Sequence, residues 1–371
     1  MLTDVNSLLA RTPVSALCGW EHRQSPKVLS VPLPGLGEWL AANPNEPFKF
    51  RWRLLTSSLT IRLGRAGKLV SFARVNPKSE IPAATKRSEG GRNPQYRGRL
   101  APSPTGLLHL GHARTFWVAQ ERARANGGTL VLRNEDIDST RFKLEFVPQM
   151  IEDLRWFGFE WQEGPDCPDQ SGFGPYNQSE RRSFYVAALE KLRSGGFIYP
   201  CTCSRKDIRD AASAPNAGDD EGPIYPGTCR NKNLSTLNPQ LSTRFSWRFR
   251  VPDGETVSFT DGNFGAQQFV AEKDFGDFVV WRQDDVPAYQ LACVVDDAAM
   301  QITEVVRGAD LLLSTARQIL LYRALGLIPP VFYHCALMLD EKGKRLAKRH
   351  AALSLRALRE QGKTPESLRR D

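Results

Sequence analysis

The sequence predicts an α/β fold built on a parallel sheet. From Tyr96 onward, extended segments alternate with a helical one: residues 97–103 and 129–136 favour strands, and residues 111–127 between them have the spacing of an amphipathic helix. A glycine-containing turn joins the first strand to this helix. Strand, helix and strand in this order form a βαβ unit, whose strands are parallel and whose ligands lie beyond the carboxyl ends of the strands.

Later segments continue the pattern. Residues 288–298 (AYQLACVVDDA) and 302–310 (ITEVVRGAD) read as strand-like pieces, and residues 310–325 have helical spacing that opens on the acidic Asp310. None of the apolar runs reaches the roughly 18 residues that a membrane-spanning helix needs. The sequence therefore predicts a nucleotide-binding α/β domain without a membrane span.

Residues 1–95 differ from the rest in composition. They are rich in Pro, Arg and Ser and hold 14 Lys/Arg against 6 Asp/Glu, so they carry +8 of the formal net charge of +9. We expect a poorly ordered basic leader and linker here, followed by an ordered domain over residues 96–371. The alternative is a dispensable extension or a mistaken start site. Because the remainder is nearly neutral, RNA contact there requires a local basic patch.

The first chemical motif is the run RLAPSPTGLLHLGH, which ends at His112. Its prolines and glycines stiffen a strand-to-helix turn, and His109 and His112 stand three residues apart where the helix begins. The backbone N–H groups and the dipole of a helix start attract phosphate, and imidazole donors add stabilisation as charge builds on phosphorus. Two histidines alone would more often be ordinary polar residues at a helix start.

The string APSPTGxLHxGH within this run resembles the signature of class I glutamyl-tRNA synthetases. The resemblance covers residues 96–371 and implies a Rossmann-like parallel sheet that binds ATP, with Mg²⁺ on its phosphates. It implies that His109 and His112 act in catalysis and contact ATP together with Gly111. The glutamate contacts that it implies are Arg99, Leu100, Ala101, Pro102, Ser103, Glu135, Tyr289 and Arg307.

Glutamate carries two carboxylates and an ammonium group, so its site needs two cationic partners and one anionic partner. An Arg guanidinium meets a carboxylate with two parallel hydrogen bonds. Arg99 is expected at the side-chain carboxylate, Arg307 at the other carboxylate and Glu135 at the ammonium group. In the alternative, Tyr289 packs in the core and Arg307 forms a surface ion pair.

The run DEKGKRLAKRH resembles the mobile KMSKS loop of class I synthetases. Lys348 aligns with the second lysine of that motif and is expected to contact ATP and to stabilise the departing pyrophosphate. Arg345 replaces the first lysine, and Ala347 replaces the serine. Without the upstream signature this run would be a solvated basic segment. The expected loop residues are Arg345, Leu346, Ala347, Lys348 and Arg349.

Three of the seven cysteines form a pattern, whereas the odd total and the scatter of the others are unlike a disulfide framework and favour a reducing cytoplasm. Cys201, Cys203 and Cys229 suit tetrahedral zinc, and Tyr225 could be the fourth ligand because bound Zn²⁺ lowers a phenol pKa from its usual value of about 10. Glutamyl-queuosine tRNA(Asp) synthetases show the same order. The resemblance implies one structural zinc in an acceptor-side insertion over residues 197–265.

Only 21 residues follow His350, fewer than an anticodon-binding domain needs. We therefore expect the glutamyl-queuosine type, a cytoplasmic and monomeric ligase that activates L-glutamate with ATP in the absence of tRNA. It transfers the glutamate to queuosine at the wobble position of tRNA(Asp). Two alternatives stay open: a fragment of a synthetase that charges tRNA(Glu), and a degenerate synthetase-like RNA-binding protein, suggested by the altered loop.

Overall fold

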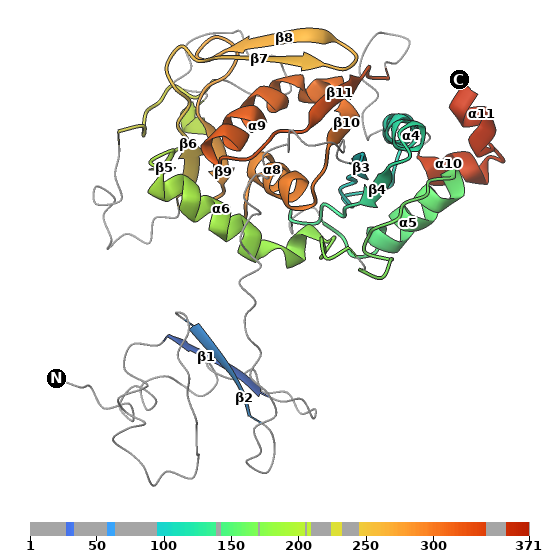
Figure 1. Ribbon diagram of the computed structural model, residues 1–371, viewed down its shortest axis with the longest axis horizontal. Helices are drawn as coiled ribbons and strands as arrows, with labels where there is room; N and C mark the ends of the chain where they lie inside the picture. The colour runs from blue at the N-terminus through green and yellow to red at the C-terminus, as the bar shows by residue number, and fades with distance from the viewer. Residues whose placement is uncertain are drawn as a thin grey trace. The chain divides into compact units, whose positions relative to one another are not determined.

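The computed structural model describes residues 27–32, 58–63, 95–138, 142–169, 171–204, 206–208, 224–231, 245–338 and 354–370. The chain divides into two units, Met1–Lys78 and Ser79–Asp371, which are described separately. Figure 1 labels their helices and strands.

In the first unit, β1 (Lys27–Pro32) and β2 (Ser58–Leu63) form an antiparallel pair in which Lys27 lies opposite Leu63. The sequence did not predict these strands, because it predicted poor order throughout residues 1–95. The other residues of this range before Gln95 lie outside the described part of the chain.

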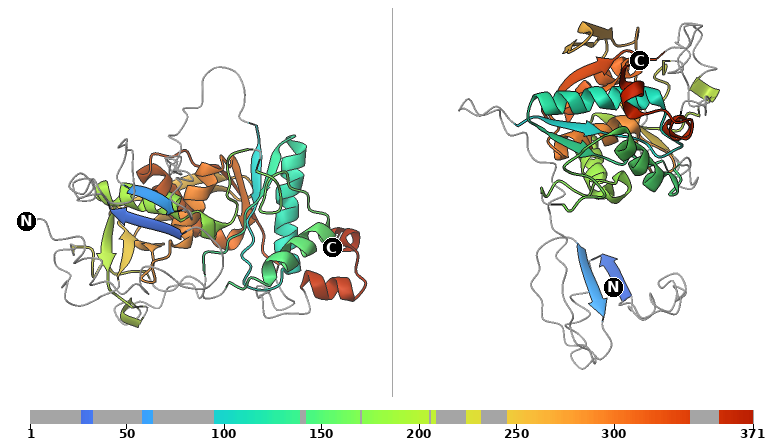
Figure 2. Two further views of the ribbon diagram at one scale, coloured as in Figure 1. Left: turned by 90° about the horizontal axis from the view of Figure 1, so that it is seen from below. Right: turned by 90° about the vertical axis from the view of Figure 1, so that its right-hand side faces the viewer.

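The second unit begins with the predicted βαβ motif, which is confirmed. It consists of β3 (Arg97–Leu100), α4 (Leu110–Ala125) and β4 (Thr129–Leu132), and the two strands pair in parallel. Helix α4 packs against the sheet, and most of its buried side chains recur every three or four residues, which places them on one face of the helix (Figure 2). Gly128 permits the turn into β4, because a Cβ there would lie 2.5 Å from the carbonyl oxygen of Tyr96.

A second sheet lies beside this motif. Its strand order is β10-β11-β7-β8, with β10 and β11 parallel and β7 and β8 forming an antiparallel hairpin (Figure 1). The amide of Thr303 donates to the carbonyl of Arg97 at 2.9 Å, so the start of β10 adjoins β3. The strands are β10 (Glu304–Gly308), β11 (Val331–Cys335), β7 (Thr256–Asp261) and β8 (Gly265–Val270).

Helices α8 (Tyr289–Ala299) and α9 (Leu312–Ala324) lie against each other (Figure 1). The expected strand at residues 302–310 and the expected helix at 310–325 are confirmed as β10 and α9. The strand-like reading of residues 288–298 is wrong, because this segment is α8. Most of the α8 side chains are buried, so no polar face reveals the helical period, and an apolar run of this length is ambiguous.

The remaining elements complete two hydrophobic cores. One core surrounds α8 and α9, and the other lies between α4, α5 and α10. None of the described helices is long and apolar enough to cross a membrane. The three-stranded antiparallel sheet has the order β5-β6-β9. These elements are α5 (Phe146–Phe157), α6 (Arg182–Ser194), β5 (Ile198–Cys201), β6 (Ser246–Phe249), β9 (Phe278–Trp281), α10 (Leu355–Glu360) and α11 (Pro365–Arg370).

A buried carboxylate ties α8 to α6 and the turn before it. Asp296 accepts hydrogen bonds from Arg181 Nε at 2.6 Å, Gln178 Nε2 at 2.7 Å and the Tyr185 hydroxyl at 2.9 Å. The side chains of Arg181 and Asp296 are both fully buried. A buried charge that loses its partner is strongly destabilising, so this ion pair fixes where α8 lies.

We predict that Asp296→Ala lowers the free energy of unfolding by about 3–5 kcal/mol, because Arg181 would stay buried without a counter-charge. Denaturant unfolding followed by circular dichroism measures this change. The matched control is Glu190→Gln, which removes an exposed carboxylate paired with Arg193 and should change stability by less than about 0.5 kcal/mol. Equal losses of unfolding free energy in the two variants would show that the buried pair of Arg181 and Asp296 stabilises the protein no more than an exposed pair does.

Candidate active site

A cavity of about 390 Å³ lies at the carboxyl ends of the parallel strands. Residues within β3 and β10 and residues that follow β3, β4, β10 and β11 line it, together with the start of α4 and the start of α8. This position is where an α/β sheet binds its ligands. The lining residues used below are Arg99, Ala101, Pro102, Ser103, His109, Gly111, His112, Glu135, Tyr289 and Arg307.

The cavity therefore brings together nearly all the residues that the sequence singled out for glutamate and ATP. Leu100 is the exception: its side chain is fully buried in the core beside α4 and does not line the cavity. The predicted loop residues, Lys348 among them, lie outside the described part of the chain.

The segments that follow β3 and β4 pair through their backbones beside the cavity. The amide of Arg133 donates to the carbonyl of Leu100 at 2.8 Å, and the amide of Glu135 donates to the carbonyl of Pro102 at 3.0 Å. The two segments thus continue side by side past the strand ends. This pairing explains how residues 36 positions apart in sequence, Arg99 and Glu135, face one cavity.

The two histidines lie together at the start of α4. The ring centroids of His109 and His112 are 3.8 Å apart, and His109 occupies the N-cap position. Gly111 leaves room for this arrangement, since a Cβ there would lie 3.2 Å from the His109 ring. Imidazole groups beside the N-terminus of a helix form a site suited to a phosphate group.

A buried ion network holds Arg99 and Glu135, which line the cavity. Arg133 donates from Nη1 to Asp297 Oδ1 at 2.6 Å and from Nη2 to Glu135 Oε1 at 3.1 Å. Arg99 Nε lies 3.5 Å from the same Asp297 oxygen, and its Nη1 donates to the carbonyl of Val306 at 2.8 Å. Carboxylates from α8 and from the segment after β4 therefore hold two arginines in fixed positions.

Burial and ion pairing act in opposite directions on these carboxylates. Burial raises the pKa of the Glu135 carboxyl, although the positive charges of Arg133 and Arg99 oppose the shift. For Asp297 burial acts in the same direction, but the two arginines outweigh it and lower the pKa. The network thus keeps Asp297 ionised as the counter-charge of both arginines.

Arg307 is held differently. Its Nε lies 3.1 Å from His334 Nε2 and its Nη2 lies 2.6 Å from Thr315 Oγ1, while Nη1 has no hydrogen-bond partner among the described residues. Only 4% of the residue is exposed. The alternative of a surface ion pair is therefore wrong for Arg307. Tyr289, at 40% exposure on the cavity wall, is not a core residue either.

Several residues that support the site were not identified from the sequence. No function was predicted for Arg133, His334 and Thr315, nor for the adjacent Asp296 and Asp297. The pair did carry a signal, because two adjacent carboxylates follow an apolar run and must be paired when buried. The sequence VFYHC around His334 carries no comparable signal.

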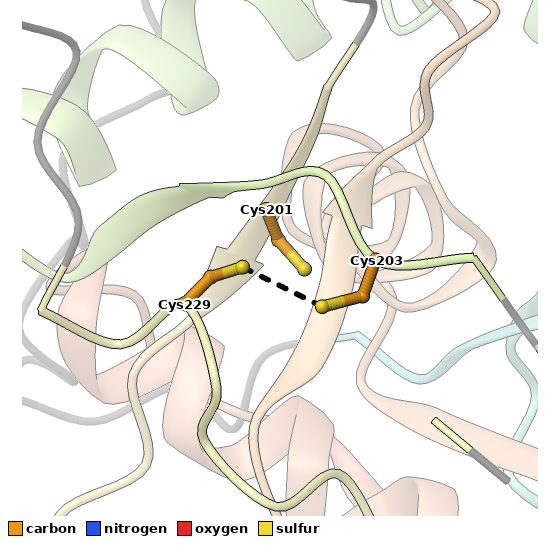
Figure 3. Close-up of side chains that lie close together, drawn as sticks. All are labelled: Cys201, Cys203 and Cys229. Carbon is orange, nitrogen blue, oxygen red and sulfur yellow. Dashed lines mark hydrogen bonds between the residues drawn. The ribbon is translucent and has the colours of Figure 1, made fainter. Parts of the chain in front are cut away.

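The predicted cysteine cluster forms beside β5 and β6. The sulfur atoms of Cys201, Cys203 and Cys229 all lie within 4.8 Å of one another, and Figure 3 shows the three side chains pointing toward one another. The Tyr225 hydroxyl lies 3.5 Å from Cys201 Sγ and 3.6 Å from Cys203 Sγ. With metal–sulfur bonds of about 2.3 Å, tetrahedral ligands stand about 3.8 Å apart, so this donor set fits one metal ion.

Neighbouring donors favour thiolate at Cys229, whereas burial raises the pKa of the Cys203 thiol to about 11 and raises the pKa of the Tyr225 hydroxyl. Burial opposes ionisation of Cys229, but hydrogen bonds from the Thr202 backbone and the Tyr225 hydroxyl outweigh it and lower the pKa of the thiol to about 6. The guanidinium of Arg248 donates to Cys201 Sγ at 3.2 Å. Because thiolate is the form that binds a metal, Cys229 is prepared to bind one.

Comparisons with known proteins agree with this geometry. A family model described as tRNA synthetases class I (E and Q), catalytic domain, matches residues 95–370. The chain is 50% identical over 268 residues to a glutamyl-Q tRNA(Asp) synthetase of Nitratidesulfovibrio vulgaris, covering 72% of this chain and 82% of that protein. It is 43% identical over 272 residues to a glutamate–tRNA ligase 2 of Nitrosococcus oceani, covering 73% of this chain and 57% of the ligase.

A solved structure shows the same fold. The glutamate-tRNA synthetase of Elizabethkingia anophelis matches with a TM-score of 0.61 and 31% identity, over 69% of this chain and 53% of that one. The signature at the start of α4, the cavity at the strand ends and the match over residues 95–370 lead to one conclusion. The chain belongs to the family of class I tRNA synthetases (E and Q) and contains their catalytic domain.

Proposed function

We propose that this protein is a glutamyl-Q tRNA(Asp) synthetase, which activates L-glutamate with ATP and transfers it to queuosine of tRNA(Asp). The observation that carries the proposal is the cavity lined by two buried arginines, Arg99 and Arg307, and the partly buried Glu135, in a chain 50% identical to a protein of that name. The identity to the glutamate–tRNA ligase is lower, at 43%.

The charge pattern of the cavity supports glutamate as the amino acid. Arg99 and Arg307 both line the cavity, and each has one guanidinium nitrogen without a hydrogen-bond partner among the described residues. Each would bind one carboxylate of the substrate. Glu135 would accept from the substrate ammonium, with Tyr289 and the segment Ala101, Pro102 and Ser103 completing the wall. Arg133 is the structural member of this set, because its charge is taken up by Asp297 and Glu135.

Activation would proceed by in-line displacement. An oxygen of the glutamate α-carboxylate attacks the α-phosphorus of ATP, the bond to the bridging oxygen breaks, and pyrophosphate leaves. His109, Gly111 and His112 would hold the phosphates at the start of α4, and Lys348 would stabilise the leaving pyrophosphate. Mg²⁺ bound with ATP would neutralise phosphate charge.

Transfer would follow on the same protein. A hydroxyl of the cyclopentenediol ring of queuosine attacks the carbonyl carbon of glutamyl-adenylate, an ester forms, and AMP leaves. No side chain is needed as a nucleophile, since binding supplies proximity. The rival acceptor is the terminal ribose of tRNA(Glu), which uses the same adenylate.

Zinc at the cysteine cluster is part of the proposal. Cys201, Cys203 and Cys229 would supply three sulfur ligands and Tyr225 the fourth, leaving no open position. Such a site is structural and would fix the acceptor-side insertion proposed for residues 197–265.

We predict glutamate-dependent exchange of pyrophosphate with ATP in the absence of tRNA. Aspartate is too short to reach both arginines, and glutamine would leave a buried guanidinium without an anion, so both should have a kcat/KM lower by at least about a hundredfold. Isotope exchange with each amino acid in turn measures this. Exchange that requires tRNA, or that glutamine supports as well as glutamate, would contradict the proposed pocket.

Purified protein should hold one zinc ion per chain, and Cys203→Ser should lower that content sharply. Elemental analysis measures the metal, with Cys167→Ser, a free cysteine outside the cluster, as the matched control. Loss of zinc should expose the insertion to proteolysis more than it slows adenylate formation, because structural zinc holds small modules folded. Full zinc occupancy in Cys203→Ser would contradict the proposed zinc site.

A further inference from the structure

A chain of three side chains runs from the hairpin strand β7 to the cavity. Asp261 Oδ2 lies 2.6 Å from His334 Nδ1, and His334 Nε2 lies 3.1 Å from Arg307 Nε. Strand pairing produces this chain, because Arg307 and His334 are direct partners in the parallel pair β10 and β11. Asp261 ends β7 at the point where β7 meets β11.

The directions of these hydrogen bonds are fixed by chemistry. A guanidinium only donates, so His334 Nε2 must accept from Arg307, and the imidazole proton must be on Nδ1, where it is donated to Asp261. Thr315 acts in parallel: its Oγ1 accepts from Arg307 Nη2, and its one hydroxyl proton can be donated to the carbonyl of Leu311 or to His334 Nε2, each 3.1 Å away. Asp261 thus selects the only neutral tautomer of His334 that can hold Arg307.

We propose that His334, oriented by Asp261, is a positioning residue that aims Arg307 at a carboxylate of the bound glutamate. This inference rests on the proposed function. A guanidinium is carried on a flexible side chain, so binding is tighter when its orientation is fixed before the ligand arrives. With Nε and Nη2 engaged by His334 and Thr315, Nη1 is the buried nitrogen of Arg307 that has no hydrogen-bond partner among the described residues, so it is the donor that a carboxylate would satisfy.

The partners of Arg307 also preserve its charge. Arg133 is neutralised by Asp297 and Glu135, whereas no ion pair to Arg307 forms among the residues that the structure describes. Burial, together with the charge of Arg307, lowers the pKa of His334 to about 4 despite the nearby Asp261, so the imidazole is neutral at neutral pH. The protein therefore holds Arg307 with neutral acceptors and leaves its positive charge for the substrate.

The alternative is that the same contacts only hold β7, β10 and β11 together. Asp261 also accepts from the amides of Asn263 and Phe264, which shapes the hairpin turn. The two readings differ in what they predict, because joining strands affects stability and positioning Arg307 affects the KM for glutamate.

Two substitutions at His334 separate the readings in the glutamate-dependent exchange assay. His334→Asn can still donate to Asp261 but is too short to reach Arg307, and it should raise the glutamate KM on the order of tenfold or more with the ATP KM within about twofold. His334→Gln places an amide oxygen near the lost Nε2 and should recover most of that increase. Tyr333→Phe, one residue earlier in β11, is the matched control and should leave both KM values unchanged.

Asp261→Asn tests the same inference without altering His334. The new amide would donate to Nδ1, which moves the imidazole proton to Nε2 and points a donor at Arg307. Nitrogen-15 NMR of labelled histidine should show Nδ1–H in the wild-type protein and Nε2–H in the variant, together with a glutamate KM raised as in His334→Asn. This variant provides the test if His334→Asn does not fold.

The inference is overturned if His334→Asn keeps the wild-type glutamate KM, if His334→Gln recovers none of the increase, or if the proton moves in Asp261→Asn without a change in glutamate KM. A different result bears on the proposed function: a wild-type protein that shows no glutamate-dependent exchange would contradict that function before any variant is compared.

Discussion

The cavity at the strand ends depends on the buried ion pair between Arg133 and Asp297. The two groups approach to 2.6 Å with 0% and 4% of their side chains exposed, so each needs the other as a counter-charge. Asp297 also lies 3.5 Å from Arg99, and Arg133 donates to Glu135. Removing this pair would leave Arg99 and Glu135 without the partners that orient them.

Helix α8 supplies the carboxylates of two buried ion pairs. Helix α8 begins at Tyr289, which lines the cavity. Its Asp297 accepts a hydrogen bond from Arg133, and its Asp296 accepts one from Arg181. Arg133, Arg99 and Arg307 therefore have different roles. Arg133 is neutralised and structural, Arg99 shares Asp297, and Arg307 is held by neutral partners. This division follows from which groups each guanidinium contacts.

The features that were predicted correctly from the sequence are those that depend on residues close together in the chain or on a recognisable spacing. The βαβ unit follows from a strand, a glycine turn and an amphipathic helix, and the cysteine cluster follows from Cys-x-Cys with a distant third cysteine. Helix α8 was missed because its buried faces conceal the period. The link from Asp261 to His334 was missed because 73 residues separate partners that only strand pairing brings together. The predicted loop at Lys348 remains a prediction.

Glutamate transfer to tRNA(Asp) tests the central claim most directly. Radiolabelled glutamate should be attached to tRNA(Asp) that carries queuosine, and not to the same tRNA prepared without it or to tRNA(Glu). All three tRNAs should be compared at equal concentration and salt, because nonspecific binding of tRNA varies steeply with salt. Equal labelling of both forms of tRNA(Asp), or preferential labelling of tRNA(Glu), would contradict the account.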